Sequence, residues 1–247
     1  MARIKLVVQY NGKNFSGWQL QPNKRTVQGE LEKVLEFLLK ENIRTYASGR
    51  TDTGVSSYGQ VVHFDCNQSI NTKKFLDSLN GLTPEDIAVM SCEIVPETFD
   101  ARFSAKKKTY QYRFYVSKYT LPLFEDTCLR VNDYVDIKKM DEASKYFIGT
   151  HDFGSFVAKK SGKTDFVRTI YDSKIIAKDD GSYAYEVTGN GFLYNMVRIM
   201  FGTLLKVGYG KMEPKSIVDI LEKKNRIYSG KTMPAKALYM KSVEYDK

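Results

Sequence analysis

The segment Ile4-Lys5-Leu6-Val7-Val8-Gln9-Tyr10 decides the first element of the fold, because every second residue, from Ile4 to Tyr10, is apolar or aromatic. This period of two predicts a strand. Behind Thr26, which is suited to cap a helix N-terminus, apolar residues recur at helical spacing: Val27, Leu31, Val34, Leu35 and Leu38. A strand followed by a helix therefore opens the chain.

The same reasoning extends over the first half of the chain. Alternation returns at Val62, Phe64 and Cys66, a short helix is predicted around Phe75 to Leu79, and residues 87–95 form another predicted strand. If the stretch just before Gly49 is also a strand, the order is β-α-β-β-α-β.

The second half begins at Thr109 and repeats this order. One strand face carries Tyr110, Tyr112, Phe114 and Val116, and a helix follows with Ile137, Met140 and Phe147 inward and Gly149 as its C-cap. Further elements are predicted as strands over 167–177 and 183–188, a helix over 191–206, a helix from Pro214 with Ile217, Ile220 and Leu221 inward, and a strand over 238–245.

These patterns predict an α+β protein with two ferredoxin-like β-α-β-β-α-β halves, residues 1–104 and 105–247. No low-complexity segment or linker separates the halves. We therefore expect a central antiparallel sheet that joins them, with an active-site cleft between them.

Composition narrows the class of protein. The 247 residues are 42% hydrophobic and include 38 Lys and Arg against 29 Asp and Glu, a net charge of +9. This charge favours an acidic partner such as nucleic acid, although many lysine-rich proteins bind none. The three cysteines are widely spaced and only two histidines occur, so neither a disulfide framework nor a metal site is expected. This cysteine usage fits a reducing cytoplasm. No membrane segment is expected, because the most apolar helical stretch carries Asn195 and Arg198.

The segment Ser48-Gly49-Arg50-Thr51-Asp52-Thr53-Gly54-Val55-Ser56 is predicted to be a shaped loop, because it lacks a hydrophobic period and contains two glycines. One interpretation is a surface turn in which Asp52 or Thr51 bonds to its own backbone. The other is a catalytic carboxylate. The loop sequence alone does not decide between them.

Two further residues are candidates for the same site. Arg198 falls among large apolar groups on a predicted helix, so it either points to solvent or needs a buried anion, such as a carboxylate that it would keep ionised. Tyr110 directly follows Lys106-Lys107-Lys108 and Thr109, and is either a core residue or a ring that stacks on a base while lysines hold phosphates.

Eight short motifs occur in one order along nearly the whole chain: Tyr10-Asn11-Gly12, Thr26-Val27-Gln28-Gly29, Gly49-Arg50-Thr51-Asp52, Ala101-Arg102-Phe103-Ser104-Ala105, Tyr110-Gln111-Tyr112, His151-Asp152-Phe153, Arg168-Thr169-Ile170 and Phe192-Leu193-Tyr194-Asn195-Met196-Val197-Arg198. Each string is short, but their order over more than two hundred residues is specific. In this order they resemble the motifs of the TruA-type tRNA pseudouridine synthases.

The resemblance implies the pseudouridine synthase fold and a role for each candidate residue. It implies that Asp52 is the catalytic aspartate, that Arg198 pairs with it, that Tyr110 packs on the target base, and that Arg50 helps to flip or replace the nucleotide. The implied reaction is isomerisation of uridine to pseudouridine at positions 38, 39 and 40 of the tRNA anticodon stem-loop, without cofactor or metal. A homodimer is also implied.

Two segments depart from the family pattern. Ser56-Ser57 replaces a common His-Ala, and the 233–238 block follows the usual closing motif only loosely. Neither change removes a catalytic group.

Phosphate contacts are expected from Lys106, Lys107, Lys108, Lys159, Lys160 and Lys163.

Two alternatives stay open at this point. One is a pseudouridine synthase for another RNA, and the other is a non-catalytic tRNA-binding protein or chaperone on the same scaffold. Asp52 argues against the second alternative, because a carboxylate inside an RNA-binding loop repels phosphate. Sequence does not decide between a covalent adduct of Asp52 and a glycal intermediate.

Overall fold

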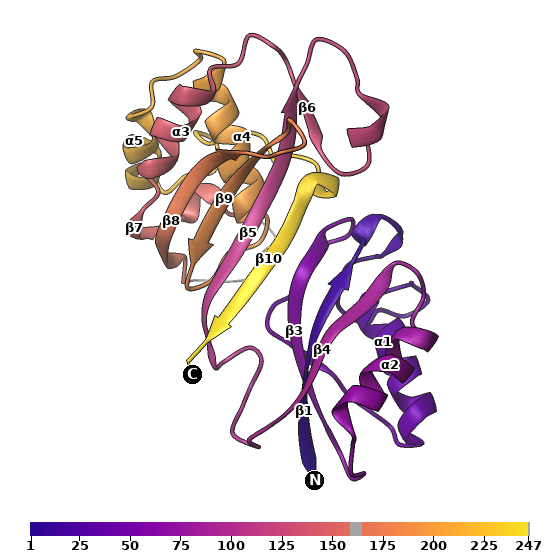
Figure 1. Ribbon diagram of the computed structural model, residues 1–247. Helices are drawn as coiled ribbons and strands as arrows, with labels where there is room; N and C mark the ends of the chain where they lie inside the picture. The colour runs from indigo at the N-terminus through magenta and orange to yellow at the C-terminus, as the bar shows by residue number, and fades with distance from the viewer. Residues whose placement is uncertain (159–164, 247) are drawn as a thin grey trace. The chain divides into compact units, whose positions relative to one another are not determined.

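The computed structural model describes residues 1–158 and 165–246 (Figure 1). The chain forms two compact units, one of residues Met1–Lys106 with Tyr239–Lys247 and one of residues Lys107–Leu238. Both units combine helices with mostly antiparallel strands, so the predicted α+β class is confirmed.

The first unit contains the predicted β-α-β-β-α-β order. Its elements are β1 (Ala2–Tyr10), α1 (Val27–Leu39), β2 (Tyr46–Ala47), β3 (Ser56–Cys66), α2 (Thr72–Leu82) and β4 (Ile87–Val95), with a 3-10 turn at Gly12–Asn14. The strands lie in the order β4-β1-β3, and β2 pairs with β3. The last strand, β10 (Leu238–Tyr245), adds a short parallel pairing in which Tyr239 faces Ser56 and Met240 faces Ser57.

The core of the first unit follows from the sequence pattern. Ile4, Leu6 and Val8 are fully buried in β1, and α1 and α2 lie on the same face of the sheet (Figure 1). The Thr26 hydroxyl accepts a hydrogen bond from Gly29 N at 3.2 Å, so Thr26 is the N-cap of α1 as predicted.

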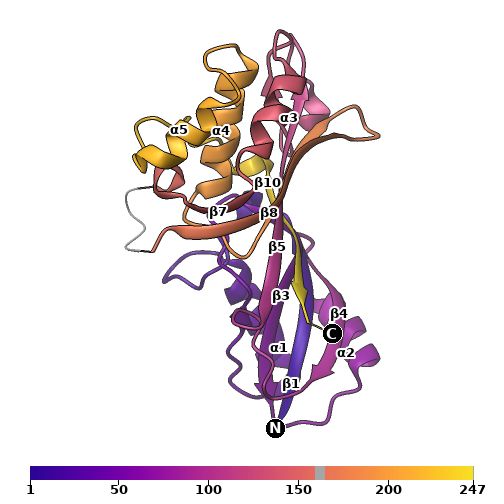
Figure 2. The same cartoon turned by 90° about the vertical axis from the view of Figure 1, so that its left-hand side faces the viewer.

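The second unit has a sheet with the order β5-β9-β8-β7. Its strands are β5 (Ala105–Val116), β6 (Leu129–Val131), which pairs in parallel with β5, β7 (Gly149–Asp152), β8 (Val167–Ala177) and β9 (Tyr183–Gly189). The helices α3 (Ile137–Lys145), α4 (Met196–Gly208) and α5 (Ser216–Lys223) lie together on one side of this sheet (Figure 2). Short 3-10 turns occur at Pro122–Phe124, Gly154–Phe156 and Ala235–Ala237.

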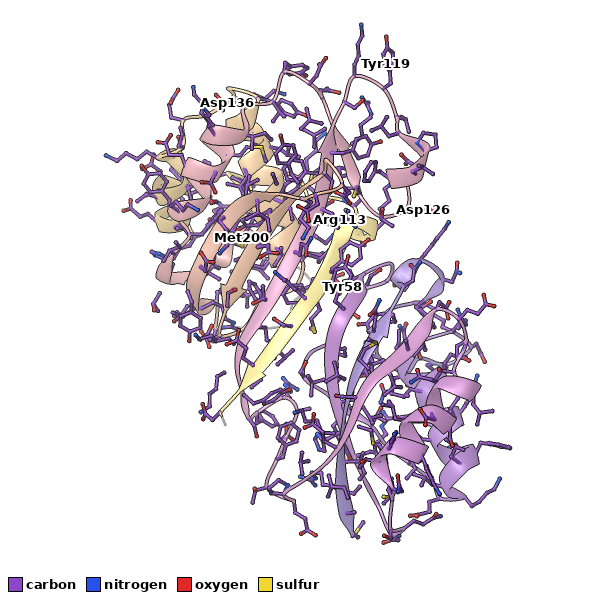
Figure 3. All side chains as sticks on the ribbon, in the orientation of Figure 1. Tyr58, Arg113, Tyr119, Asp126, Asp136 and Met200 are labelled. Carbon is purple, nitrogen blue, oxygen red and sulfur yellow. The ribbon has the colours of Figure 1, made fainter. Side chains whose placement is uncertain are left out.

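The aromatic residues of β5 build the core of this unit. The ring of Tyr112 stacks on Phe201 of α4 at a centroid distance of 4.3 Å, and Phe114 packs against the same ring at 5.0 Å. Met200, labelled in Figure 3, is fully buried on α4 as well. The face of β5 that carries Tyr112 and Phe114 is therefore the face that α4 covers.

Helix boundaries in this unit differ from the predicted ones. Helix α3 ends at Lys145 with Tyr146 as its C-cap, whereas Gly149, at φ 117°, begins β7. Helix α4 begins at Met196 rather than at 191, because Asn195 before it has φ 60° and interrupts the helical backbone. Helix α5 begins at Ser216, two residues after Pro214.

The chain does not divide into units in simple sequence order. Residues Tyr239–Lys247 belong to the first unit, whereas order along the chain assigned them to the second half. Among the described residues, no helix is both long enough and apolar enough to span a membrane.

Candidate active site

The Asp52 loop, residues 48–56, connects β2 to β3 in the first unit. Val55 N donates to the Asp52 carbonyl at 3.1 Å and Gly54 has φ 79°, so the backbone turns sharply directly after Asp52. Asp52 is half-buried, whereas Arg50 is exposed. The loop is therefore shaped as predicted, and Asp52 is partly sheltered from solvent.

The amide of Gln60 on β3 fixes the start of the Asp52 loop. Gln60 is fully buried, its Nε2 donates to the Gly49 carbonyl at 2.7 Å, and its Oε1 accepts from the Ser48 hydroxyl at 2.6 Å. A buried amide that lost these partners would leave several polar groups unpaired. Gln60 thus holds the loop on the side that precedes Asp52.

The segment between β1 and α1 supports the middle of the loop. The Tyr10 hydroxyl and Thr51 Oγ1 share a buried hydrogen bond of 2.7 Å, and Trp18 N donates to the Thr51 carbonyl at 3.1 Å. Burial raises the pKa of Tyr10, so its hydroxyl keeps its proton at physiological pH.

Gly17 lies against the backbone of the same loop. It has φ 88°, and a Cβ at this position would lie 2.6 Å from the Thr51 carbonyl oxygen and 3.2 Å from the Asp52 carbonyl carbon. Only glycine allows both this conformation and this approach. Residue 17 therefore sets the backbone position of Thr51 and Asp52.

The last strand supports the end of the loop and its start. The Ser57 hydroxyl donates to the Met240 carbonyl at 3.2 Å, and the Ser48 hydroxyl lies 3.9 Å from Met240 Sδ. Tyr58, labelled in Figure 3, stacks on Tyr239 with ring centroids 5.0 Å apart. The Asp52 loop is thus held by β1, β3 and β10 together.

Arg198 lies in the second unit, in the first turn of α4. Its Nε donates to the Met233 carbonyl at 2.6 Å and one terminal nitrogen donates to Asn195 Oδ1 at 2.7 Å. The side chain is half-buried, and these two bonds fix the plane of its guanidinium group. Arg198 is therefore oriented rather than freely mobile.

Tyr110 belongs to the same unit and is also half-buried. Its ring meets Phe192 edge-to-face at a centroid distance of 5.0 Å. Two residues along β5, the Tyr112 hydroxyl donates to the Pro234 carbonyl at 2.8 Å, next to the Met233 carbonyl that Arg198 binds. Tyr110 and Arg198 thus come from adjoining parts of one packed region.

The predicted phosphate contacts have different surroundings. Exposed Lys106 forms an ion pair with Asp246 at 2.9 Å, Lys107 Nζ lies 5.5 Å from the centroid of the Tyr171 ring, and Lys108 is half-buried opposite Gly189. Lys159, Lys160 and Lys163 lie outside the described residues.

Thiolate chemistry and metal binding have little support among the described residues. Burial raises the pKa of the three cysteine thiols, that of Cys92 to about 11, so none is a ready thiolate at neutral pH. No group of three or more His, Cys, Asp or Glu side chains suited to hold a metal occurs within residues 1–158 and 165–246.

The arrangement can perform carboxylate chemistry. Asp52 sits on a loop whose backbone is fixed before and after it, so the carboxylate is presented in a defined place. A positioned carboxylate can act as a nucleophile or as a general base.

The sequence prediction missed three residues that build this loop, Gln60, Tyr10 and Gly17. An uncharged amide within a strand of apolar residues was the available signal for Gln60. No local pattern indicated that Tyr10 and Gly17 contact residues more than thirty positions away.

Comparison with known proteins gives consistent matches. The model of a family described as tRNA pseudouridine synthase matches residues 6–104 and 143–246. The chain is 46% identical over 247 residues to tRNA pseudouridine synthase A of Anoxybacillus flavithermus, and the match covers 100% of both chains. It is 47% identical over 248 residues to tRNA pseudouridine synthase A 1 of Bacillus cereus, with 100% of both chains covered. It is 46% identical over 246 residues to tRNA pseudouridine synthase A of Bacillus subtilis, with 99% of each covered.

A solved archaeal box H/ACA sRNP Nop10–Cbf5 complex also matches, at 13% identity and a TM-score of 0.34. The match covers 81% of this chain and 53% of that chain, so this protein spans about half of its length. The full-length relatives and the family match carry the assignment. This chain belongs to the tRNA pseudouridine synthase family.

Proposed function

We propose that this protein isomerises uridine to pseudouridine in tRNA, with Asp52 as the catalytic carboxylate. Membership of the family supports the reaction. The observation that carries the role of Asp52 is its place on a loop that is fixed before Asp52 by Gln60, Tyr10 and Trp18. After Asp52, Gly54 N donates to the Phe15 carbonyl at 3.4 Å. Such support is what a catalytic group needs to stay in its productive position.

The reaction needs no net oxidation and no added group. The glycosidic bond between the ribose and the uracil nitrogen breaks, the uracil rotates, and a carbon of the ring bonds to the same ribose carbon. That ring carbon loses its proton and the released ring nitrogen gains one, so the atoms of the product are those of the substrate. Asp52 either attacks as a nucleophile or removes a ribose proton to give a glycal. Both routes need an ionised carboxylate at the ribose.

Arg198 and Tyr110 are proposed to serve the same uridine. A guanidinium beside a carboxylate favours its ionised form, which supports pairing of Arg198 with Asp52 during the reaction. The half-buried ring of Tyr110 offers an apolar face for the uracil. Arg50 is proposed to fill the space that an extruded nucleotide leaves, and its exposure on the Asp52 loop supports this role.

The proposed substrate positions are 38, 39 and 40 of the tRNA anticodon stem-loop. Bases in an A-form stem are hidden in a deep groove, so an enzyme that acts there recognises the backbone shape and flips the target out. Lys106, Lys107, Lys108, Lys159, Lys160 and Lys163 are proposed phosphate contacts, supported by the net charge of +9. A homodimer and a cytoplasmic location complete the proposal.

The test compares Asp52→Asn with a matched acid-to-amide change in the same unit. Asp77→Asn is the control, because Asp77 is exposed on α2. Purified proteins act on tRNA transcripts with one uridine at each of the three positions, without added metal or nucleotide, and pseudouridine is mapped by carbodiimide labelling and primer extension. We expect Asp77→Asn to react like wild type and Asp52→Asn to form no pseudouridine while binding tRNA normally.

Each alternative gives a different result. Activity of Asp52→Asn within tenfold of wild type would refute the assignment of Asp52. Modification confined to another RNA or another stem would refute the substrate positions and keep the chemistry. Tight tRNA binding by a wild-type protein that makes no pseudouridine in any RNA would identify a binding protein or chaperone.

A further inference from the structure

The connection from β4 to β5 (Figure 1) ends in a tight turn, residues 100–104. Phe103 in this turn is exposed. Asp100 Oδ1 accepts hydrogen bonds from Arg102 N at 2.7 Å and from Phe103 N at 2.8 Å. Ser104 N donates to the Asp100 carbonyl at 3.0 Å, and Asp100 N donates to Ser104 Oγ at 3.0 Å. Four hydrogen bonds thus hold five residues in one conformation.

The turn is also anchored to the sheet of the first unit. Ala101 is fully buried, its N donates to His63 Nδ1 at 3.0 Å, and its carbonyl accepts from the Tyr245 hydroxyl at 2.7 Å. The backbone beside Phe103 therefore has little freedom. A rigid support lowers the entropy lost when a displayed side chain binds a ligand.

Phe103 is 80% exposed, although the guanidinium of Arg102 lies only 5.2 Å from its ring centroid. A single exposed phenylalanine is common in proteins and by itself indicates nothing. Here the ring has a cation beside it, exposed Lys106 follows three positions later, and the backbone is locked. An aromatic ring combined with cations is the arrangement that binds unpaired nucleotides.

We propose that Phe103 stacks on an unpaired base of the RNA substrate, while Arg102 contacts the phosphate next to it. The inference rests on the proposed function for its ligand, an RNA. Bases of a paired stem stay stacked on each other, whereas loop bases can lie on a protein ring, so the ligand is a loop nucleotide. It is distinct from the target uridine, which is assigned to Tyr110.

The one acidic side chain of the turn does not oppose this assignment. Asp100 Oδ1 accepts from two backbone N–H groups, which offset its charge and orient the carboxylate toward the turn. Arg102, by contrast, is exposed. Lys106 is exposed as well but pairs with Asp246, so Arg102 is the cation assigned to the phosphate.

The first experiment measures affinity for an RNA hairpin with an unpaired loop and for a fully paired duplex of the same stem. The variants are Phe103→Ala and Phe103→Trp, and the matched control is Phe37→Ala. Phe37 is 61% exposed on α1, and Lys40 Nζ lies 4.1 Å from its ring centroid. The control thus removes a ring of similar exposure with a neighbouring cation.

Loss of a base-stacking ring weakens binding by about 5- to 150-fold. We expect a loss in this range for Phe103→Ala with the hairpin, little change with the duplex, and hairpin affinity close to that of wild type for Phe103→Trp and Phe37→Ala. The chain's single tryptophan, Trp18, is 2% exposed and so is shielded from a bound RNA. A change in tryptophan fluorescence of Phe103→Trp on RNA binding would therefore come from position 103. Its fluorescence should change on addition of the hairpin and stay constant with the duplex.

Salt dependence separates the two side chains. Arg102→Gln should reduce the slope of log affinity against log salt by about 1, whereas Phe103→Ala should leave the slope unchanged. Equal hairpin affinity of Phe103→Ala and wild type, or an equal loss for Phe37→Ala, would overturn the proposal. A lower mass of Phe103→Ala by light scattering would assign the ring to contact with a second copy instead. Because binding is read without turnover, failure of Asp52 to act as the catalyst would leave this result intact.

Discussion

Replacement of Gly17 by alanine tests whether the backbone beneath Asp52 sets the rate of the reaction. Gly17 has φ 88°, and an alanine in the left-handed region costs about 1–2 kcal/mol. Its Cβ would also lie 2.6 Å from the Thr51 carbonyl oxygen, a backbone atom that cannot rotate away. Since Cβ contacts under 3.0 Å essentially do not occur, the two segments must separate by about 0.4 Å or more.

This displacement falls directly on the residue before Asp52. A misplacement of about 1 Å at a catalytic group can cost about 100-fold in rate, so a shift of a few tenths of an ångström is expected to lower kcat/KM by about tenfold. Gly181→Ala provides the matched control. Gly181 has φ 80°, and no atom lies within 4 Å of a Cβ built there, so its alanine carries the left-handed strain without the collision.

The assay measures kcat/KM for pseudouridine formation and the free energy of unfolding for both variants. We expect Gly181→Ala to lose about 1–2 kcal/mol of stability and to keep the wild-type rate. Gly17→Ala should lose more stability and about tenfold in kcat/KM, measured at a temperature where both variants are folded. Equal kcat/KM for the two variants would refute the reasoning.

Three further changes probe other parts of the molecule. Arg198→Lys keeps the charge but cannot keep both hydrogen bonds to Met233 and Asn195. We therefore expect kcat and Tm to fall while the Kd for tRNA stays within about threefold of wild type. A normal kcat would show that orientation of the guanidinium is unimportant. Burial lowers the pKa of His63, so below pH ~6.5 the folded protein binds fewer protons than the unfolded chain. The stability that the neutral His63 contributes is therefore present above pH ~6.5 and is lost as the pH falls from there toward the folded pKa. His63→Asn, which keeps an acceptor for Ala101 N, should therefore show a shallower pH dependence of unfolding between pH 8 and pH 5, and an unchanged dependence would contradict the role of His63. Changing Lys106, Lys107 and Lys108 to glutamine should reduce the slope of log tRNA affinity against log salt by up to about 3. The same change at Lys73 and Lys74, which are exposed on α2, should leave this slope unchanged. An unchanged slope for the first variant would show that these three lysines do not contact phosphates.

The strands were predictable because their side chains alternate between a buried and an exposed face. The observed bounds of β4, β8 and β10 match the predicted ones, and the buried positions of β1 are those the period of two selected. The short strands β6 and β7 went unpredicted, since three or four residues carry no clear period. Their pairing partners in β5 and β8 define them instead.

Helix ends were less predictable, because apolar spacing can continue where the helix does not. Phe147 is fully buried although it lies beyond the end of α3, and Leu193 is 5% exposed although it precedes α4. Both side chains fit the apolar spacing of a helix, but each reaches the core from backbone outside the helix. The left-handed conformation of Asn195, which delays the start of α4 to Met196, could not be predicted from the spacing of apolar residues.

The candidate site was predictable only one residue at a time. The glycines and polar residues around Asp52 indicated a loop, and an arginine among apolar residues marked position 198. The supports of the loop were not visible, because Tyr10 and Thr51 are 41 positions apart and Ser57 and Met240 are 183 apart. Hydrogen bonds over such separations depend on the whole fold.

The return of the last strand to the first unit has a consequence for the order in which the protein is made. A ribosome synthesises β1 to β4 first, and then the whole of Lys107–Leu238, before residues 239 and 240 emerge to pair with the start of β3. Until then the Met240 contacts to Ser48 and Ser57, at the two ends of the Asp52 loop, cannot form. The growing chain therefore completes the supports of the Asp52 loop only after residue 240 has emerged, and translation that stops before residue 239 leaves that loop without them.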